Sequence, residues 1–452
     1  MKAMSNDKPQ GVCASALTSI VGEENAVCLW QNIELAQQKG IQQAIVPGKL
    51  PSCIVYPHTQ EQLAAVIATA AKNSWRVLPC GSGSKLSWGG LAKGVDVVVS
   101  TERINRLIEH AVGDLTVTVE AGMKFSKLEA LLANSRQFLA LDPTAPQSAT
   151  IGGIVATGDT GSLRQRYGSV RDQLLGITFV RADGEIAKAG GRVVKNVAGY
   201  DLMKLFTGSY GTLGVISQVT FRLYPLQEAS ATVVLTGKVE AVSQAADTLR
   251  GSALTPVQAD LLSTKLVSSL GLGEGLGLIA RFQSISESVK EQSNRVLEVG
   301  QKLSLVGTIY IDSDEANLWK RLQQRIHYPV KESVITCKIG VLPTAAVEIL
   351  SKVELGLIHL SSGLGLLQLE DKNQVLQMRD GLRSGGSDAY GGLRLRTQAH
   401  SGFLTILEAP VAVKEQIDVW GYTGNGLPLM RRIKEQFDSK NILSPGRFVG
   451  GI

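Results

Sequence analysis

The sequence predicts a mixed α+β fold in two domains, and three observations support this prediction. Short strand-like and helix-like segments alternate between glycine-rich loops over residues 45–226, a pattern typical of α/β units. From 227 to 410 the alternating segments are longer and glycine turns are fewer. With 452 residues, the chain is also longer than one hydrophobic core usually supports. We therefore expect an arm at 1–44, a first domain at 45–226, a second domain at 227–410 and a C-terminal segment at 411–452.

The beginning of the chain predicts a helix followed by a β-α-β unit. Residues 15–40 are expected to form a polar first helix, and SCIVYP forms a short strand that ends at Pro57. Thr59 and Gln62 have the spacing of a capping box, and apolar residues recur behind them at helical spacing, which predicts a helix over 60–73. RVLPCG is then predicted to form the second strand of this unit. Its carboxyl end carries the first glycine-rich loop, at the edge where α/β units bind ligands.

The remainder of the first domain is predicted to contain further strands and one helix. VDVVVS and LTVTVEAG are strand candidates, and FSKLEALLANS is an amphipathic helix. ITFVRADGEIAKAG has the pattern of a hairpin, and the pair Asp183-Gly184 suits the positive φ angles of a type I′ turn. The alternating residues 215–224 form the strand that closes this domain before Pro225.

The second domain shows repeated strand-helix pairs. SATVVLTG, residues 278–283 and SVITCKIG are strand candidates, while VEAVSQAADTLRGS, SESVKEQSNRVLEVGQKL and TAAVEILSKVEL are helix candidates. This order predicts one antiparallel sheet with helices on one face. Residues 427–437, LPLMRRIKEQF, are expected to form a helix after it.

Two loops of the first domain, near 80–90 and 141–168, are rich in glycine, small residues and hydroxyls. Glycine allows a backbone to approach a ligand closely, and successive N–H groups in such loops hold anions. We therefore expect a phosphate-bearing cofactor. A Rossmann fingerprint does not fit, because its sixth position is Leu86, and no P-loop glycine stands at the required distance before Lys85.

Three stretches in this order and spacing resemble the FAD-binding domain of the vanillyl-alcohol-oxidase or p-cresol-methylhydroxylase (PCMH) type: PCGSGSKLSWGG, TIGGIVATGDTGSLRQRYGSVRDQLLGITFVRADGEI and TGSYGTLGVISQVTFRLYP. The resemblance covers about residues 45–226, with a matching tail at LMRRIKEQFDSKNILSPGRF. It implies a two-subdomain PCMH-type FAD-binding fold, an α+β cap with an antiparallel sheet and a C-terminal return to the FAD domain. Together with VKNVAGYDLMKLFTGSYGTLG, the pattern is most similar to the smaller FAD-binding subunits of glycolate oxidases (glycolate dehydrogenases), the E-type subunits.

The resemblance assigns FAD contacts to residues of the glycine-rich loops. These are Pro79, Gly81, Ser82, Gly83, Ser84, Lys85, Pro143, Thr144, Thr150, Gly152, Gly153, Ala156, Thr157, Gly161, Gly168, Gly211, Gly214 and Ile216. Lys85 is expected either to neutralise a phosphate or simply to be exposed to solvent, and the sequence leaves both interpretations open. Ser444 stands where the family has asparagine, which puts a flavin contact from that side chain in doubt.

Catalytic candidates are few. Arg164 and Arg166 lie beside the second loop, where a guanidinium favours an anionic reduced flavin or pairs with a substrate carboxylate, the alternative being a surface arginine. Tyr167 is expected to serve packing. Related hydroxy-acid oxidising proteins carry an HxGDGNxH-type motif, whereas the histidines here are isolated, and isolated histidines are usually structural. The histidines are His58, His110, His327, His359 and His400.

His400, with Arg394 and Arg396 nearby, is the best catalytic candidate among the histidines, in the role of a base for the substrate hydroxyl. No histidine pair has metal-ligand spacing, so no metal is expected. The first glycine-rich loop has no histidine for a covalent flavin link, and Cys80 there is expected to be a small buried residue. We therefore expect FAD to be bound noncovalently.

The composition of the chain limits which partners and which cellular compartment we expect. The formal net charge of +6 is spread along the chain without the basic blocks typical of nucleic-acid binding. The five cysteines are scattered, which favours a reducing compartment, and no CxxC pair suggests an iron–sulfur cluster. Every apolar stretch is interrupted before the ~20 residues that a membrane helix requires. We expect a cytoplasmic protein, or one that associates with a membrane through its partners.

The residues and the resemblance together predict an FAD-binding subunit of a multi-subunit glycolate dehydrogenase. A larger flavin subunit and an iron–sulfur subunit are its expected partners, and a small 2-hydroxy acid is the expected substrate. Because the histidine motif is missing, the isolated chain is expected not to oxidise glycolate or D-lactate. The alternatives are a stand-alone FAD-dependent dehydrogenase for a D-lactate-like 2-hydroxy acid and a flavin-binding scaffold without turnover.

Overall fold

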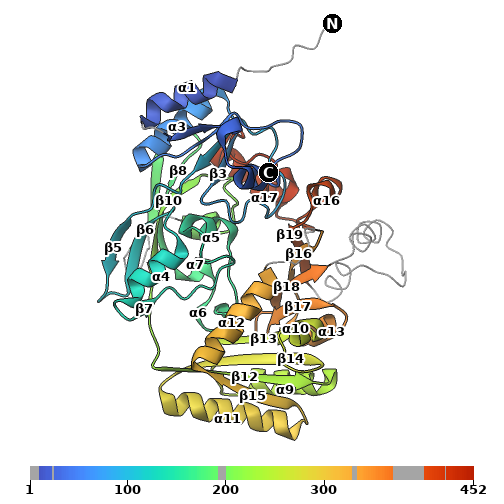
Figure 1. The fold of residues 1–452 in the computed structure, drawn as a ribbon. Helices are drawn as coiled ribbons and strands as arrows, with labels where there is room; N and C mark the ends of the chain where they lie inside the picture. The colour runs from blue at the N-terminus through green and yellow to red at the C-terminus, as the bar shows by residue number, and fades with distance from the viewer. Residues whose placement is uncertain (1–9, 23–24, 192–199, 328–332, 370–401, 423) are drawn as a thin grey trace.

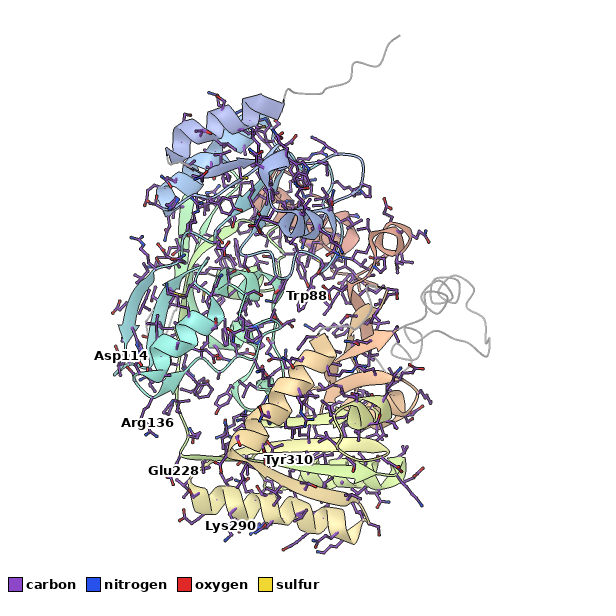
Figure 2. The ribbon with its side chains drawn as sticks, viewed as in Figure 1. Trp88, Asp114, Arg136, Glu228, Lys290 and Tyr310 are labelled. Atoms are coloured by element: carbon purple, nitrogen blue, oxygen red, sulfur yellow. The ribbon has the colours of Figure 1, made fainter. Side chains whose placement is uncertain are left out.

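The computed structural model places two domains one above the other, joined by a linker at Glu228 (Figures 1 and 2). The first domain also contains the N-terminal arm and the C-terminal segment, which lie together at one end of the molecule. The structure describes residues 10–22, 25–191, 200–327, 333–369, 402–422 and 424–452.

The arm is more divided than the predicted helix over 15–40. It contains helix α1 (Gln10–Val21), strand β1 (Val27–Leu29), a 3-10 turn and helix α2 (Leu35–Gln42). The helix prediction is wrong between α1 and α2 because β1 pairs antiparallel with the strand that follows, Val27 lying opposite Val55. Tertiary pairing overrides the local helical pattern there.

The first sheet of this domain has four strands in the order β1-β2-β4-β3. Its other strands are β2 (Cys53–Val55), β3 (Val77–Cys80) and β4 (Val97–Ser100). Helix α3 (Gln60–Asn73) begins as predicted, since the hydroxyl of Thr59 accepts the N–H of Gln62 at 3.2 Å. The parallel pairing of β3 with β4 places the first glycine-rich loop at the carboxyl edge of this sheet.

The second sheet has five antiparallel strands in the order β5-β6-β10-β8-β9. They are β5 Leu107–Ala111, β6 Thr116–Glu120, β8 Leu174–Val180, β9 Ile186–Gly190 and β10 Val215–Arg222, with helix α4 Phe125–Ala133 between β6 and β8. The predicted hairpin is present, but the prediction of a type I′ turn at its tip is wrong. Of Asp183 and Gly184 only Gly184 has positive φ, and the loop runs from Arg181 to Glu185.

The segment 141–168, predicted as a loop, includes two short helices. They are α5 (Ile151–Thr157) and α6 (Arg164–Tyr167), and α7 (Val170–Gln173) follows them. Beyond this segment lie helix α8 (Leu202–Phe206) and the strand pair β7 (Gln137–Phe138) with β11 (Tyr224–Pro225).

The second domain contains one eight-stranded antiparallel sheet in the order β15-β12-β14-β13-β17-β18-β16-β19. Its strands are β12 Ala229–Gly237, β13 Gln258–Leu262, β14 Leu276–Ser284, β15 Val306–Ile311, β16 Ile335–Gly340, β17 Leu355–His359, β18 Leu364–Leu369 and β19 Phe403–Glu408. Its helices are α9 Val239–Gly251, α10 Thr264–Ser269, α11 Ser286–Lys302, α12 Asp312–His327 and α13 Ala346–Ser351.

The prediction that helices cover one face of this sheet is wrong, because both faces are covered. Val233 packs in one core cluster with α9, α11 and α13, whereas its neighbour Val234 packs in another with α10 and α12. Successive strand residues point to opposite faces, so two adjacent buried valines require two covered faces. Helix α12 lies on the side that faces the first domain (Figure 1).

The C-terminal segment contains helices α16 (Val411–Gln416) and α17 (Leu427–Phe437) and then runs beside β3. Val77 donates its N–H to the carbonyl of Ile442 at 2.7 Å, and Ser444 donates to the carbonyl of Val77 at 2.9 Å. No helix among the described residues is long and apolar enough to cross a membrane. The hydrogen bonds to Val77 thus place the C-terminal segment beside β3, the strand that carries the first glycine-rich loop.

Lys434 holds this return in place. Its buried ammonium pairs with Asp438 at 2.6 Å and donates to the carbonyls of Thr212 and Leu443, both at 2.9 Å. Burial lowers the pKa of this lysine. The ammonium thus joins α17, the segment after it and the loop before β10.

We expect Lys434→Met to lower the free energy of unfolding by about 3–5 kcal/mol, because it leaves the buried Asp438 carboxylate without its cation. Chemical denaturation followed by circular dichroism measures this. The control is Arg432→Met on the exposed side of the same helix, which should leave stability within about 0.5 kcal/mol. Equal stability of the two variants would contradict this role of Lys434.

Candidate functional site: two adjoining cavities

The first cavity has an empty volume of about 670 Å³, which includes space open to solvent. Three segments form it: the loop after β3, helix α5 with the residue before it, and the residues leading into β10. It brings together most of the predicted cofactor residues. These are Pro79, Gly81, Ser82, Gly83, Ser84, Lys85, Thr150, Gly152, Gly153, Ala156, Thr157, Gly211, Gly214 and Ile216.

The other predicted cofactor residues lie elsewhere. Pro143, Thr144 and Gly161 line a second cavity between the two domains. Gly168 lines neither of these cavities and instead ends α6 with φ of 78°, a conformation that favours glycine. The second glycine-rich segment is thus divided between the two cavities and a helix terminus.

The loop from Ser82 to Lys85 offers consecutive backbone N–H groups to the first cavity. Within the described parts of the chain, no oxygen accepts a hydrogen bond from these four N–H groups. Successive unpaired N–H groups in a turn make a concave site for an anion. The loop therefore fits a pyrophosphate.

Two kinds of glycine occur here. A Cβ on Gly81 would lie 2.0 Å from Oγ1 of Thr150, and a Cβ on Gly152 would lie 2.7 Å from Cβ of Ala121, so packing within the chain already requires glycine. A Cβ on Gly153 would meet only Oγ1 of Thr150, at 3.1 Å, and would otherwise point into open space. Gly153 is therefore the glycine whose small size leaves room for a ligand.

Arg447 fixes the first loop from the C-terminal segment. Its buried guanidinium donates to the carbonyls of Leu86 at 2.7 Å and Trp88 at 3.1 Å, and it also lines the cavity. Burial lowers the pKa of Arg447 to about 10, so the group remains a cation at neutral pH. This contact ties the end of the first loop to the C-terminal segment.

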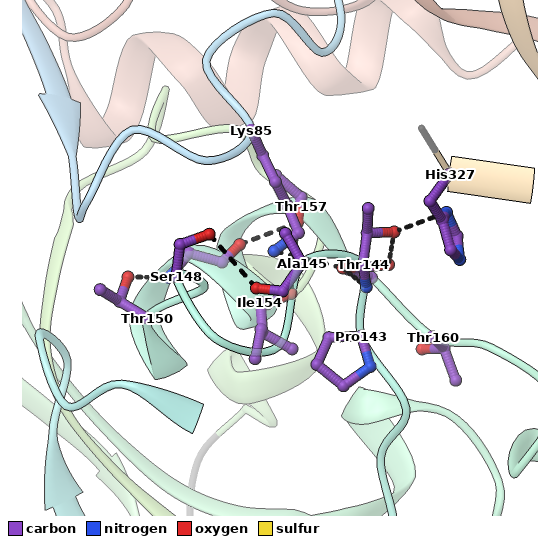
Figure 3. Close-up of polar contacts among 12 residues, drawn as sticks. Lys85, Pro143, Thr144, Ala145, Ser148, Thr150, Ile154, Thr157, Thr160 and His327 are labelled. Atoms are coloured by element: carbon purple, nitrogen blue, oxygen red, sulfur yellow. Dashed lines mark hydrogen bonds and ion pairs between the residues drawn. The ribbon is translucent and has the colours of Figure 1, made fainter. Parts of the chain in front are cut away.

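Lys85 lies at the junction of the two cavities. It lines the first cavity, and its Nζ lies 3.2 Å from a carboxylate oxygen of Asp159, which lines the second (Figure 3). Both side chains are buried, so the alternative of a solvent-exposed lysine is wrong. Nζ has no hydrogen bond of good geometry among the described residues and makes only this ion pair, which leaves it free to donate to a ligand.

The second cavity has an empty volume of about 1420 Å³ and separates the first domain from α12 and the sheet of the second. Trp88 stands at this boundary (Figure 2). The cavity is lined by two histidines, His327 and His359, and by Arg164 and Lys338. The expectation that these histidines are isolated is wrong, because the fold brings both to one cavity. His400 lies outside the described residues.

His327 and His359 have different surroundings. Nδ1 of His327 lies 3.1 Å from the hydroxyl of Thr144 (Figure 3). This hydroxyl in turn donates to a carboxylate oxygen of Asp159 at 3.3 Å. Burial lowers the pKa of His327 to about 4, so this ring is neutral at pH 7. Nδ1 of His359 instead lies 2.6 Å from a carboxylate oxygen of the buried Asp260.

Arg164 and Lys338 supply positive charge to this cavity. Neither side chain has a hydrogen bond or ion pair with any residue that the structure describes. Burial and the charge of Arg164 lower the pKa of Lys338. Arg166 is exposed, and Tyr167 packs against Tyr224 with ring centroids 4.6 Å apart. Of the two arginines predicted beside the loop, only Arg164 reaches a cavity.

Two acidic groups of the cavity, Glu129 and Asp142, have raised pKa values. Burial raises the pKa of Glu129 to about 7 and that of Asp142 to about 6. Asp142 accepts the N–H groups of Gly161 and Leu163, both at 3.0 Å, and so shapes the segment before α6. Arg164 and Lys338 thus line the second cavity together with these two carboxyl groups.

The fold and the first cavity define a flavoprotein. A family model described as an FAD binding domain matches residues 51–190, which contain the loop after β3 and helix α5. Residues 51–190 therefore form an FAD binding domain, the chain as a whole has the fold of the PCMH-type flavoproteins, and its cofactor is FAD. The predictions of family, cofactor and α+β fold class are thereby confirmed.

Its relatives are oxidoreductases. The chain is 26% identical to the mitochondrial D-lactate dehydrogenase [cytochrome] of Arabidopsis thaliana over 433 residues, covering 88% of this chain and 74% of that protein. It is 28% identical to the glycolate oxidase subunit GlcD of Bacillus subtilis (strain 168) over 214 residues, 47% of this chain and 46% of the other. The structure of p-cresol methylhydroxylase with substrate bound has the same fold, with a TM-score of 0.71, 15% identity and coverage of 97% and 96%. The chain is an FAD-dependent oxidoreductase.

Noncovalent binding of FAD is the first prediction from this site. Cys80, the cysteine that lines the first cavity, has its pKa raised by burial to about 12, so it is a thiol and a poor nucleophile. Acid precipitation of the purified protein should therefore release all FAD into the supernatant, as measured by absorbance. Yellow colour that stays with the pellet would show a covalent bond.

A second prediction concerns Gly153. Gly153→Val adds side-chain atoms that point into the first cavity, and overpacking of this kind costs about 1–3 kcal/mol. FAD content per chain should collapse while the far-ultraviolet circular dichroism stays unchanged. The control is Gly113→Val, at an exposed glycine where a Cβ meets nothing within 4 Å. A Gly153 variant that purifies fully loaded with FAD would show that the loop is only a turn.

Proposed function

We propose that this chain is an FAD-dependent dehydrogenase of small 2-hydroxy acids. The observation that carries the proposal is the pair of cations, Arg164 and Lys338, which face the second cavity without a carboxylate partner among the described residues. A cavity of this kind next to a flavin pocket suits a substrate that brings its own carboxylate. The known activities of the D-lactate dehydrogenase and the glycolate oxidase subunit support this substrate class.

The residues of the second cavity have separate tasks in this proposal. FAD, when bound, supplies a two-electron acceptor for the hydride on the carbon that bears the hydroxyl. Arg164 presents a planar guanidinium that binds a carboxylate with two hydrogen bonds, and Lys338 adds a second positive charge. The neutral His327 contributes hydrogen bonding without charge. Trp88 and the apolar lining residues exclude water from the reacting carbon.

Glycolate is the substrate that we propose within this class, with this chain acting as the FAD-binding subunit of a multi-subunit glycolate dehydrogenase. A larger flavin subunit and an iron–sulfur subunit would then pass the electrons to an acceptor other than oxygen, in the cytoplasm or at a membrane. The E-type sequence pattern supports this assignment. The similarity to the D-lactate dehydrogenase of Arabidopsis thaliana supports a stand-alone dehydrogenase of a D-lactate-like acid as the second candidate.

Arg164→Gln tests the carboxylate site. Losing a charge-assisted hydrogen bond costs about 1.5–3 kcal/mol, so Kd for oxalate, a dianion that resembles the substrate carboxylate, should rise about 10- to 100-fold. Titration calorimetry of the FAD-loaded protein measures this. Arg166→Gln, two residues further along the same helix and exposed, is the control and should leave Kd unchanged. Unaltered oxalate binding in Arg164→Gln would move the carboxylate site elsewhere.

A further inference from the structure

The sheet of the second domain has one edge whose outer backbone groups are unpaired. β15 is the outermost strand and pairs with β12 in an unbroken register from Val306 to Ile311. Antiparallel pairing directs the N–H and C=O groups of every second residue toward the neighbouring strand, so the remaining groups of β15 point outward. Among the described residues, none makes a hydrogen bond to these outward groups.

The sequence of β15, VGTIYI, lacks the features that usually block an edge strand. Exposed edges are commonly protected by charged side chains, by proline or by a β-bulge. β15 contains no charged residue and no proline, and its register with β12 has no shift. Val306 and Ile311 are 67% and 55% exposed, although both are large apolar residues. Such a strand is a template for pairing with another strand.

The position of β15 leaves this edge accessible. β15 lies at the end of the second domain that is away from the first domain, whereas β19, at the other edge of the sheet, lies near α16 (Figure 1). Helix α11 packs on a face of the sheet rather than across its edge, because a Cβ on Gly307 would meet Leu297 of α11. A strand added to β15 therefore does not meet the flavin-binding domain.

The edge is complementary to itself in an antiparallel pair. Directly opposed residues must both direct their backbone groups toward the partner strand or both away from it. A two-fold axis at Thr308 satisfies this condition, and it sets Thr308 opposite Thr308 of a second copy and Val306 opposite Tyr310. Threonine pairs and pairs of an aromatic with a β-branched residue are favourable cross-strand contacts. An axis at Ile309 also satisfies the condition, but it sets the apolar Val306 opposite Asp312.

Charges at the two ends of β15 support the same orientation. Lys302 stands shortly before the strand, Asp312 and Asp314 follow it, and all three side chains are exposed. None of the three has an ion pair with a residue that the structure describes. In an antiparallel pair the start of each strand meets the end of the other, so Lys302 of each copy comes to the acidic end of its partner. Such complementarity favours this pairing over a parallel one, in which like charges meet.

We propose that β15 is the dimerisation edge of this protein, and that two copies pair their β15 strands antiparallel about a two-fold axis at Thr308. The two eight-stranded sheets then form one continuous sheet. The interface is closed, because the same edge serves both copies. The flavin-binding domains lie at the two ends of the dimer, away from the axis. The inference is independent of the proposed function, since β15 lines neither the flavin pocket nor the second cavity.

The test uses the full chain loaded with FAD. Sedimentation velocity from low to high micromolar concentration measures the mass, which is expected to shift from that of one chain, 48.2 kDa, to twice this value. Hydrogen–deuterium exchange at the same concentrations reports on the interface. The amides of residues 306–311 should become protected as the dimer forms.

Two charge variants test the axis at Thr308, whose side chain is exposed. Thr308→Lys and Thr308→Glu each set like charges opposite one another in the dimer, so the dimer Kd of either variant should rise about 10- to 100-fold. An equal mixture of the two pairs lysine with glutamate and should restore the dimer. The control is Thr248→Lys, at an exposed threonine of α9, which should dimerise as wild type does. FAD content and melting temperature should match wild type in every variant.

Several results overturn the inference. One is a wild-type chain that sediments as a monomer at every concentration, or that pairs only with a different subunit. Another is a dimer that persists unchanged in both Thr308 variants, since its interface then lies elsewhere. Variants that are monomeric alone and remain so when mixed contradict the two-fold pairing at Thr308. Should a variant lose its fold or its FAD, the wild type decides alone, because a dimer with unprotected amides at 306–311 also overturns the inference.

Discussion

Hydrogen bonds between the segment 142–162 and the second domain are the contacts on which the site depends. The hydroxyl of Thr144 meets His327, the hydroxyl of Ser162 meets Asp260, and Gln323 donates to the carbonyl of Pro143. Each group is buried or half-buried, where an unpaired polar group is costly. The two domains therefore close in one relative position, and the second cavity has a defined shape beside the flavin pocket.

Charge in this region is arranged in buried pairs with unpaired cations beside them. Lys85 meets Asp159, and Asp260 meets His359, so each of these two buried carboxylates has a partner within the protein. Arg164 and Lys338 are left to an incoming anion. Such an arrangement suits an acidic molecule. Within the residues described here, no group of three or more His, Cys, Asp and Glu is placed to hold a metal ion.

Local chemistry made the flavin pocket predictable from the sequence. Glycine-rich turns and the helix cap at Thr150 depend on residues that are close together in the sequence, so their spacing indicates a phosphate site. The periodic recurrence of apolar residues likewise predicts most strands and helices. The second cavity could not be found in this way. Arg164, Asp260, His327, Lys338 and His359 come from five separate elements, and only strand register and domain closure unite them. One signal was overlooked: two adjacent buried valines in β12 already required helices on both faces of the sheet.

The return of the C-terminal segment has a consequence for how the protein is made. Residues 442–447 complete the first domain, yet they follow the entire second domain in the sequence. Arg447 contacts the carbonyls of the first loop only after some 360 intervening residues have been synthesised. A nascent chain emerging from the ribosome thus holds an unfinished flavin pocket for most of its synthesis. The residues that complete the flavin pocket are therefore synthesised only after those of the second domain.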